Sequence, residues 1–269
     1  MSTIAGTPLD VAVDGGVAWV TLNRPERLNA LDPALIRALN EFFVSLDAHS
    51  PARVVVLRGA GRAFCAGLDL KDMQASGGAR QGVEAMLAVQ KNVRDIMLAM
   101  RRCPQPIVSI VQGAASGGGF ALALASDIRL ATPDARMNAS FIRLGLSGCD
   151  VGVSYFLPRM VGASVAAEYL LTGRFIDAAR AHALGLVSRV GSVEELEREA
   201  RALCADMLRA TPLALRLTKE ALGLAIDAGS METVIALEDR NQVLCTQGDD
   251  FAEGIAAFLD KREPRYGGQ

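Results

Sequence analysis

Short apolar runs alternate with amphipathic segments through the first half of the chain. Asp32 and Pro33 are typical of a helix start, as N-cap and first helical residue. The alternation of strands and helices predicts an α/β body. Strands are expected at 11–13, 17–22, 53–58, 107–111 and 127–131, and helices at 33–46, at 82–102 and from about residue 117.

From residue 163 onward the pattern is helical, with a strand expected only at 186–190. We therefore expect two units, a core at 1–200 and a C-terminal helical oligomerisation region at 201–269. The apolar faces of the second unit have no sheet to cover, which predicts packing on a neighbouring subunit. The polar stretch 72–82 predicts a loop, and 137–155 is expected to be irregular before a short helix.

Composition narrows the function classes. The 269 residues are 51% hydrophobic and carry a formal net charge of −2, with no basic run interleaved with aromatics, so a nucleic-acid partner is not expected. A membrane span needs about 20 largely apolar residues in succession, and no stretch of the sequence meets that requirement, so no span is expected. The first residues do not resemble a signal peptide, and the five dispersed cysteines form no CxxC pair, so we expect a cytoplasmic protein with reduced thiols.

Only two histidines, His49 and His182, are present, and both are expected in surface or helix-packing roles. With so few imidazoles and no clustered thiols, neither a zinc site nor a Ser-His-Asp triad is expected. Any acid–base chemistry must therefore come from a carboxylate.

Three successive glycines, 117–119, follow the buried strand at 107–111 and open a helix. Without β-carbons, amide N–H groups at this helix start can reach an acceptor, and the helix dipole favours negative charge there. The turn therefore predicts an oxyanion or anion site, or else only close packing of helix on strand. A second small-residue turn at 59–70 offers further amides, whereas the phosphate-loop, GxGxxG and GxSxG motifs are absent.

Taken in order, several short motifs resemble those of the crotonase (enoyl-CoA hydratase/isomerase) superfamily. They are Asn-Arg-Pro at 23–25, Leu-Asn-Ala-Leu at 28–31, and the segments 64–70, 112–119, 125–129, 171–174, 183–187 and 258–262. The resemblance implies a crotonase-like spiral of ββα units with a C-terminal helical trimerisation region. It also implies a homo-trimer or hexamer that binds acyl-CoA, with coenzyme A as part of the substrate and no further cofactor.

By position in these motifs, the resemblance implies that the amides of Leu68 and Gly118 form an oxyanion hole for the thioester carbonyl. Removing one such donor typically costs about 3 kcal/mol in barrier. The resemblance also implies a coenzyme A site near the Arg24 turn, with help from a neighbouring subunit's tail. Its residues are expected to be Arg24, Ala30, Leu70, Lys71, Phe258 and Lys261.

Two departures from the family matter for chemistry. Ala121 and Phe141 occupy the positions where the family's hydratases carry glutamates, and neither side chain moves a proton. The later aspartate of the dienoyl-CoA isomerases is retained as Asp150.

Asp150 is expected either to cap the following helix or to act as the acid–base, with Ser154 and Tyr155 as candidate hydrogen-bonding partners. Desolvation in an acyl pocket makes a lone carboxylate a stronger base, and one group that removes and returns a proton suits double-bond migration. The hypothesis is thus isomerisation or hydration of an enoyl-CoA. Hydrolysis, carbon–carbon bond chemistry and a catalytically silent CoA-binding subunit stay open. The acyl chain is expected to be selected by 72–82 and the next helix, including Met73, Met86, Leu87 and Gln90.

Overall fold

The computed structural model describes residues 7–77 and 82–267. Its main feature is a six-stranded sheet with strand order β1-β2-β3-β4-β6-β9. β1 is antiparallel to β2 and the other neighbours are parallel. The expected α/β body is therefore confirmed. The strands are β1 (Leu9–Asp14), β2 (Val17–Leu22), β3 (Val54–Gly59), β4 (Ile107–Val111), β6 (Ile128–Ala131) and β9 (Arg189–Val190).

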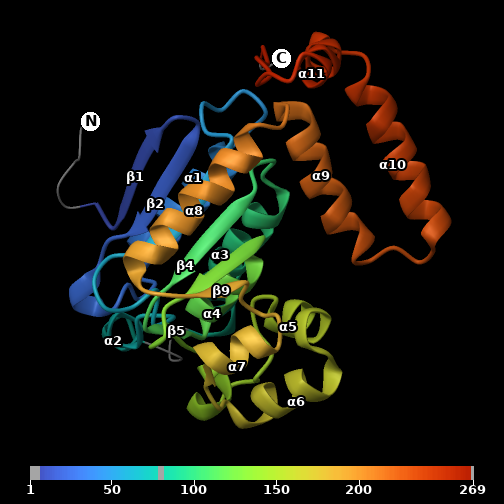
Figure 1. The fold of residues 1–269 in the computed structure, drawn as a ribbon. Helices are drawn as coiled ribbons and strands as arrows, with labels where there is room; N and C mark the ends of the chain where they lie inside the picture. Colours follow the sequence, from blue (N-terminus) through green and yellow to red (C-terminus); the bar gives the residue numbers. More distant parts are fainter. Residues whose placement is uncertain (1–6, 78–81, 268–269) are drawn as a thin grey trace.

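Helices cover both faces of this sheet (Figure 1). On one face lies α8 (Val193–Leu208), whose buried Leu196, Ala200 and Cys204 pack against apolar strand residues that include Trp19. The opposite face carries the larger core, formed with α1 (Pro33–Ser45), α3 (Val83–Arg102) and α4 (Gly118–Ala125). The central strands are buried on both faces, which explains their uninterrupted apolar runs: residues 54–57 of β3 are all fully buried.

A second, three-stranded sheet has the order β5-β7-β8. β5 (Ala114–Ser116) and β7 (Arg136–Asn138) are parallel, and β8 (Ile176–Asp177) is antiparallel to β7. The expectation of no strand after residue 163 except 186–190 is therefore wrong. Strands of two or three residues are too short for alternation to reveal them.

Two loop predictions also need correction. The stretch 72–82 begins in the last turns of α2 (Leu70–Ala75), which Asp69 caps by accepting a hydrogen bond from the Asp72 amide at 3.2 Å. Residues 78–81 lie outside the described residues. The region 137–155 holds the end of β7, a 3-10 turn at Ser140–Leu144 and the first residues of α5 (Val153–Val161).

Below the sheet in Figure 1, α5, α6 (Ala163–Thr172) and α7 (Ala178–Ala183) gather in a compact lobe. The last three helices instead extend away from the body, with α9 and α10 side by side. They are α9 (Pro212–Ala225), α10 (Met231–Cys245) and α11 (Asp249–Leu259). The boundary predicted at residue 200 falls within α8, and the division into two units stays a prediction.

Large apolar side chains are exposed along the extended helices. They include Leu222, Met231, Val243, Phe258 and Leu259, which are 65, 69, 60, 83 and 72% exposed. This exposure agrees with the expectation that a neighbouring subunit covers these helices, and that expectation stays a prediction.

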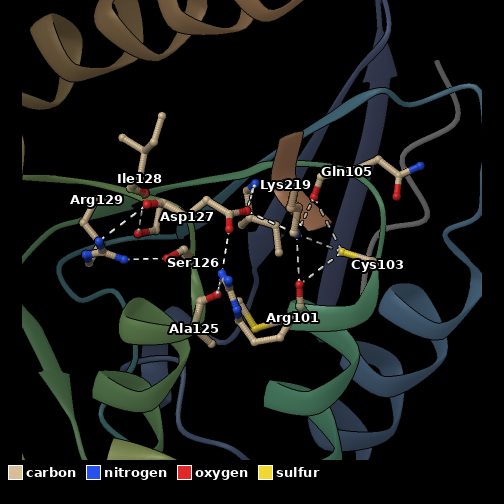
Figure 2. Close-up of polar contacts among 12 residues, drawn as sticks. Arg101, Cys103, Gln105, Ala125, Ser126, Asp127, Ile128, Arg129 and Lys219 are labelled. Carbon is tan, nitrogen blue, oxygen red and sulfur yellow. Dashed lines mark hydrogen bonds and ion pairs between the residues drawn. The ribbon is translucent and has the colours of Figure 1, made fainter. Parts of the chain in front are cut away.

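One buried cation anchors α9 to the body (Figure 2). The Lys219 ammonium donates to the carbonyl oxygens of Gln105 at 2.7 Å and Met100 at 3.1 Å. It also pairs with Asp127 Oδ2 at 3.1 Å, although its side chain is only 5% exposed. The Arg101 guanidinium donates to the other oxygen of Asp127 at 2.6 Å, which completes the anchor.

All five cysteines carry free thiols, as expected. Within residues 7–77 and 82–267, none of the helices is both long and apolar enough to cross a bilayer.

Candidate active site

The glycine-rich turn between β5 and α4 places backbone where a side chain would not fit. A β-carbon on Gly119 would lie 2.0 Å from the carbonyl oxygen of Cys65, so this position requires glycine. Gly117 has a φ of +53°, in the left-handed region that glycine adopts readily. Helix and strand are therefore closely packed at this turn, and the oxyanion or anion site expected there stays a prediction.

The second small-residue turn lies directly against the first. Gly67 has a φ of +92°, and a β-carbon there would approach Ser116 O to 2.6 Å and Gly118 N to 3.5 Å. The turn is held to residue 31 on both sides of Leu68: the Leu31 amide donates to Gly67 O at 2.7 Å, and the Asp69 amide donates to Leu31 O at 3.0 Å. Leu68 is thereby fixed beside the start of α4.

The amides of Leu68 and Gly118 belong to the two turns that these contacts hold together. Gly118 is the first residue of α4, where an amide has no partner within the helix. Among the residues that the structure describes, neither amide donates a hydrogen bond to the backbone or to a side chain. An unpaired N–H at the N-terminus of α4, with a second unpaired N–H on the turn packed against it, can receive an anionic or developing negative oxygen.

An ion-pair network fixes the Leu68 turn from the side. The Arg24 guanidinium pairs with Asp32 at 3.0 Å and with Asp69 at 3.2 Å, and it donates to Ala30 O. Burial acts to raise the pKa of the Asp69 carboxyl, but the Asp72 amide and Arg24 outweigh it, so that pKa lies below its usual value. Because Arg24 is largely engaged within the protein, its main visible effect is to order the segment after Leu68.

Asn29 completes this support. Its side-chain amide donates to the carbonyl oxygens of Ala63 at 2.8 Å and Ala60 at 2.9 Å, and its Oδ1 accepts from the Arg24 amide at 2.9 Å. Asn29 is fully buried and has a positive φ of 55°. Asn29 lies in a local sequence motif, but its cross-link between two loops, the one before α1 and the one before α2, is not predicted by any local pattern.

Asp150 lies in the loop before α5 and is half-buried. Its Oδ1 accepts hydrogen bonds from the Val151 amide at 2.8 Å and from the side-chain amide of Gln90 on α3. The capping alternative is wrong, because the N-cap of α5 is Gly152 and no side chain caps this helix. Tyr155, a candidate partner of Asp150, donates instead to Asp227.

α3 connects Asp150 to the amide pair. Gln90 and Val93 are three residues apart and therefore lie on one side of the helix. A β-carbon on Gly118 would lie 4.0 Å from Val93 Cγ1 and 2.8 Å from Leu31 Cδ1. The side of α3 that reaches Asp150 thus also borders Gly118. Gln90 was expected to help select the acyl chain, but its bond to Asp150 was not predicted, because no local pattern in the sequence indicates such a contact.

The positions that departed from the family are apolar and largely enclosed. Ala121 is fully buried on α4 and Phe141 is 9% exposed. A β-carbon on Gly117 would lie 3.2 Å from Phe141 Cε1, so this ring borders the glycine turn. At both positions, a buried apolar side chain occupies the place where the resemblance implies a carboxylate in hydratases.

The residues predicted to bind coenzyme A fall into two groups. Arg24, Ala30, Leu70 and Lys71 surround the Leu68 turn, with Ala30 buried and Leu70 and Lys71 exposed on α2. Phe258 lies in the last turn of α11 and Lys261 just beyond it, and Figure 1 places α11 at the opposite end of the molecule from α2. One chain does not bring the two groups together, so the role of the tail residues stays a prediction that needs a neighbouring subunit.

Two surface hollows lie apart from these residues. One, of about 520 Å³, is lined by Leu9, Val11, Arg37 and other residues of β1 and α1. The other, of about 510 Å³, lies at the start of α9 beside Arg53, Gln105 and Arg216. Neither is lined by Leu68, Gly118 or Asp150.

Known proteins resemble this chain along nearly its whole length. The family model described as enoyl-CoA hydratase/isomerase matches residues 12–269. A protein named "Probable enoyl-CoA hydratase echA12" from Mycobacterium bovis is 38% identical over 259 residues, covering 93% of this chain and 89% of that protein. The 1,2-epoxyphenylacetyl-CoA isomerase of Escherichia coli K12 is 33% identical over 257 residues, covering 96 and 97%.

Solved structures agree with the sequence relatives. The crystal structure of an enoyl-CoA hydratase from Bacillus anthracis superposes with a TM-score of 0.91 at 32% identity, covering 97% of this chain and 100% of that one. An enoyl-CoA hydratase from Mycobacterium smegmatis gives a TM-score of 0.88 at 36% identity, covering 96 and 98%. These similarities bear out the crotonase-like fold.

Proposed function

The chain belongs to the enoyl-CoA hydratase/isomerase family, and on that premise we propose that it is an isomerase that moves a double bond within an enoyl-CoA. The amides of Leu68 and Gly118 hold the thioester carbonyl oxygen, and Asp150 transfers the proton. The observation that carries the proposal is that the amides of Leu68 and Gly118 donate no hydrogen bond to any residue that the structure describes. Of the three acid–base positions that the resemblance implies, Ala121 and Phe141 are apolar, and Asp150 alone carries a carboxylate.

The two amides supply the electrophilic part of the reaction. When a proton leaves the substrate, negative charge develops on the thioester oxygen, and preorganised N–H donors stabilise it without reorientation. The positive end of α4 acts in the same direction at Gly118. Together, these donors lower the barrier to forming an enolate-like intermediate.

Asp150 supplies the proton transfer. Its carboxylate removes a proton from one carbon of the acyl chain, the electron pair moves toward the thioester, and the same proton returns to a second carbon. General acid–base catalysis of this kind contributes typically about 10²–10⁴ in rate. Hydration would also require a group to activate water, and the apolar Ala121 and Phe141 favour isomerisation over it. The Escherichia coli relative is an isomerase of an acyl-CoA thioester, which supports isomerisation in preference to hydration.

We further propose that the active unit is a homo-oligomer, a trimer or a dimer of trimers. The exposed apolar residues of α9, α10 and α11 support this arrangement. A neighbour's tail would then bring Phe258 and Lys261 to the coenzyme A bound near Lys71, which a single chain does not do.

The test uses purified protein with a 3-enoyl-CoA, the matching 2-enoyl-CoA and 1,2-epoxyphenylacetyl-CoA, followed by mass spectrometry and chromatography. We expect interconversion of the two enoyl-CoA isomers, with no mass change in water, and a loss of about 10²–10⁴ in kcat for Asp150→Asn. Acyl-CoA binding, measured by calorimetry, should be retained in that variant. Formation of a 3-hydroxyacyl-CoA as the main product would replace the proposal with hydration. An Asp150→Asn variant as fast as the parent would remove the carboxylate assignment.

A further inference from the structure

The contacts of the Asp150 carboxylate are unevenly shared between its two oxygens. Oδ1 accepts from both the Val151 amide, at 2.8 Å, and the Gln90 side chain. Oδ2 accepts no hydrogen bond from any residue in the described ranges 7–77 and 82–267. We infer that Gln90 is a positioning residue that, together with the Val151 amide, engages Oδ1 and leaves Oδ2 as the oxygen that transfers the proton. This inference rests on the function proposed above and deepens it.

The Val151 donor is built into the backbone at an energetic cost. Val151 has a φ of +40°, a conformation that β-branched residues rarely adopt and that costs about 1–3 kcal/mol. Its side chain is only 7% exposed within the main core, which holds the strained backbone in place. The core therefore holds Val151 in one place, and with it the amide that donates to Oδ1.

The Gln90 donor comes from a different element. Gln90 lies on α3, on the side of the helix that borders Gly118, and its own side chain is exposed. An exposed glutamine on a helix is ordinarily solvated, so its reach to a carboxylate in another loop is a specific contact. It connects the element beside the amide pair to the proposed base.

An amide side chain suits this task chemically. Glutamine donates through N–H and does not titrate, so it neither gives nor takes the proton that Asp150 moves. When Oδ2 takes a proton from the acyl carbon, Oδ1 becomes the carbonyl oxygen of the carboxylic acid and continues to accept both hydrogen bonds. The proton then leaves Oδ2 for the second carbon, and the carboxylate is restored with its orientation unchanged.

The experiment compares three substitutions of Gln90 in the full-length protein. Gln90→Met keeps the length and removes the donor, and Gln90→Glu keeps the size but places a second carboxyl group against Asp150 in place of the neutral amide donor. We expect each to lower kcat by about 10- to 100-fold, the range for a hydrogen bond to a charged group, with little change in KM. Gln90→Lys retains a donor of similar reach and should recover part of this loss. Lys91→Met, at the next position of the same helix, is the matched control and should keep the parent kcat.

The outcomes separate the inference from the function on which it rests. An active parent with Gln90→Met as fast as Lys91→Met would overturn the positioning role alone. An increase in KM at unchanged kcat would assign Gln90 to acyl-chain binding instead. A parent that transforms no thioester would overturn the proposed function and this inference with it. Thermal unfolding of each variant confirms that a lower kcat does not come from loss of folded protein.

Discussion

Two aspartates, Asp127 between α4 and β6 and Asp150 before α5, differ in how their carboxylate oxygens are bonded. Asp127 has donors on both oxygens: Arg101 on Oδ1 at 2.6 Å, and Lys219 at 3.1 Å and the Ile107 amide at 2.8 Å on Oδ2 (Figure 2). Among the residues that the structure describes, Asp150 has donors on Oδ1 alone. A carboxylate with both oxygens engaged holds a structure together, whereas one with a free oxygen keeps a lone pair for chemistry.

The largest expected effect tests the structural half of this comparison. Asp127→Ala leaves the buried Lys219 ammonium without its counter-ion, and removing one partner of a buried ion pair typically costs about 3–5 kcal/mol in the free energy of unfolding. Chemical denaturation of the parent protein and of Asp127→Ala measures this cost. Asp150→Ala is the matched control, and we expect it to cost less than about 1 kcal/mol because it strands no buried charge. Equal destabilisation of the two variants would break the comparison.

A smaller effect is expected when the cation itself is removed. Lys219→Met fills the same volume with an apolar chain and leaves Asp127 with Arg101 and the Ile107 amide, so we expect a loss of about 1–3 kcal/mol. The distinguishing measurement is the double variant Asp127→Ala with Lys219→Met. It should be more stable than Asp127→Ala alone, because no buried ammonium then lacks a partner. Additive losses in the double variant would show that the stranded charge is not the cause.

The local parts of this architecture were predictable, and the contacts between distant segments were not. The β4 strand and the turn at Gly117–Gly119 could be identified because a continuous apolar run and three glycines are local signals. β8 and α2 were missed because elements of two and six residues give too few positions for a period to appear. The Asp127 anchor depends on Lys219 from α9, and no spacing in the sequence relates these two residues.

The residues of the candidate site also divide into those that local motifs indicate and those whose contacts only the fold shows. Leu68, Gly118 and Asp150 were singled out through motifs, and the structure packs the turn at Gly67 and Leu68 against the start of α4. Gln90 was expected only as a side chain that shapes the acyl pocket, because its partner lies in a loop whose path the sequence does not specify. Whether a carboxylate is fully or half engaged therefore has to be read from the fold.

A third aspartate, Asp227, is paired but exposed, so it separates the effect of burial on stability from the effect of pairing. It accepts a hydrogen bond from the Tyr155 hydroxyl and pairs with Arg159 at 3.2 Å, but its side chain is 54% exposed. Solvent competes for an exposed pair, so Tyr155→Phe should cost only about 0.5–1.5 kcal/mol, less than either change at the buried anchor. Chemical denaturation at neutral pH measures this difference, and a cost equal to that of Asp127→Ala would show that pairing alone, without burial, sets the strength.

The hydrogen bond from Tyr155 to Asp227 also predicts that stability depends on pH. Partial burial, followed by the hydrogen bond to Asp227, raises the pKa of Tyr155 above its ordinary 10.0. A raised pKa in the folded state means that the unfolded chain releases this proton first, so the contribution is complete below about pH 10 and declines as the pH rises through the folded-state value. The stability difference between the parent and Tyr155→Phe should therefore be constant from neutral pH to about pH 9 and shrink above pH 10. A difference that grows with alkalinity would mean that Tyr155 does not donate its proton to Asp227.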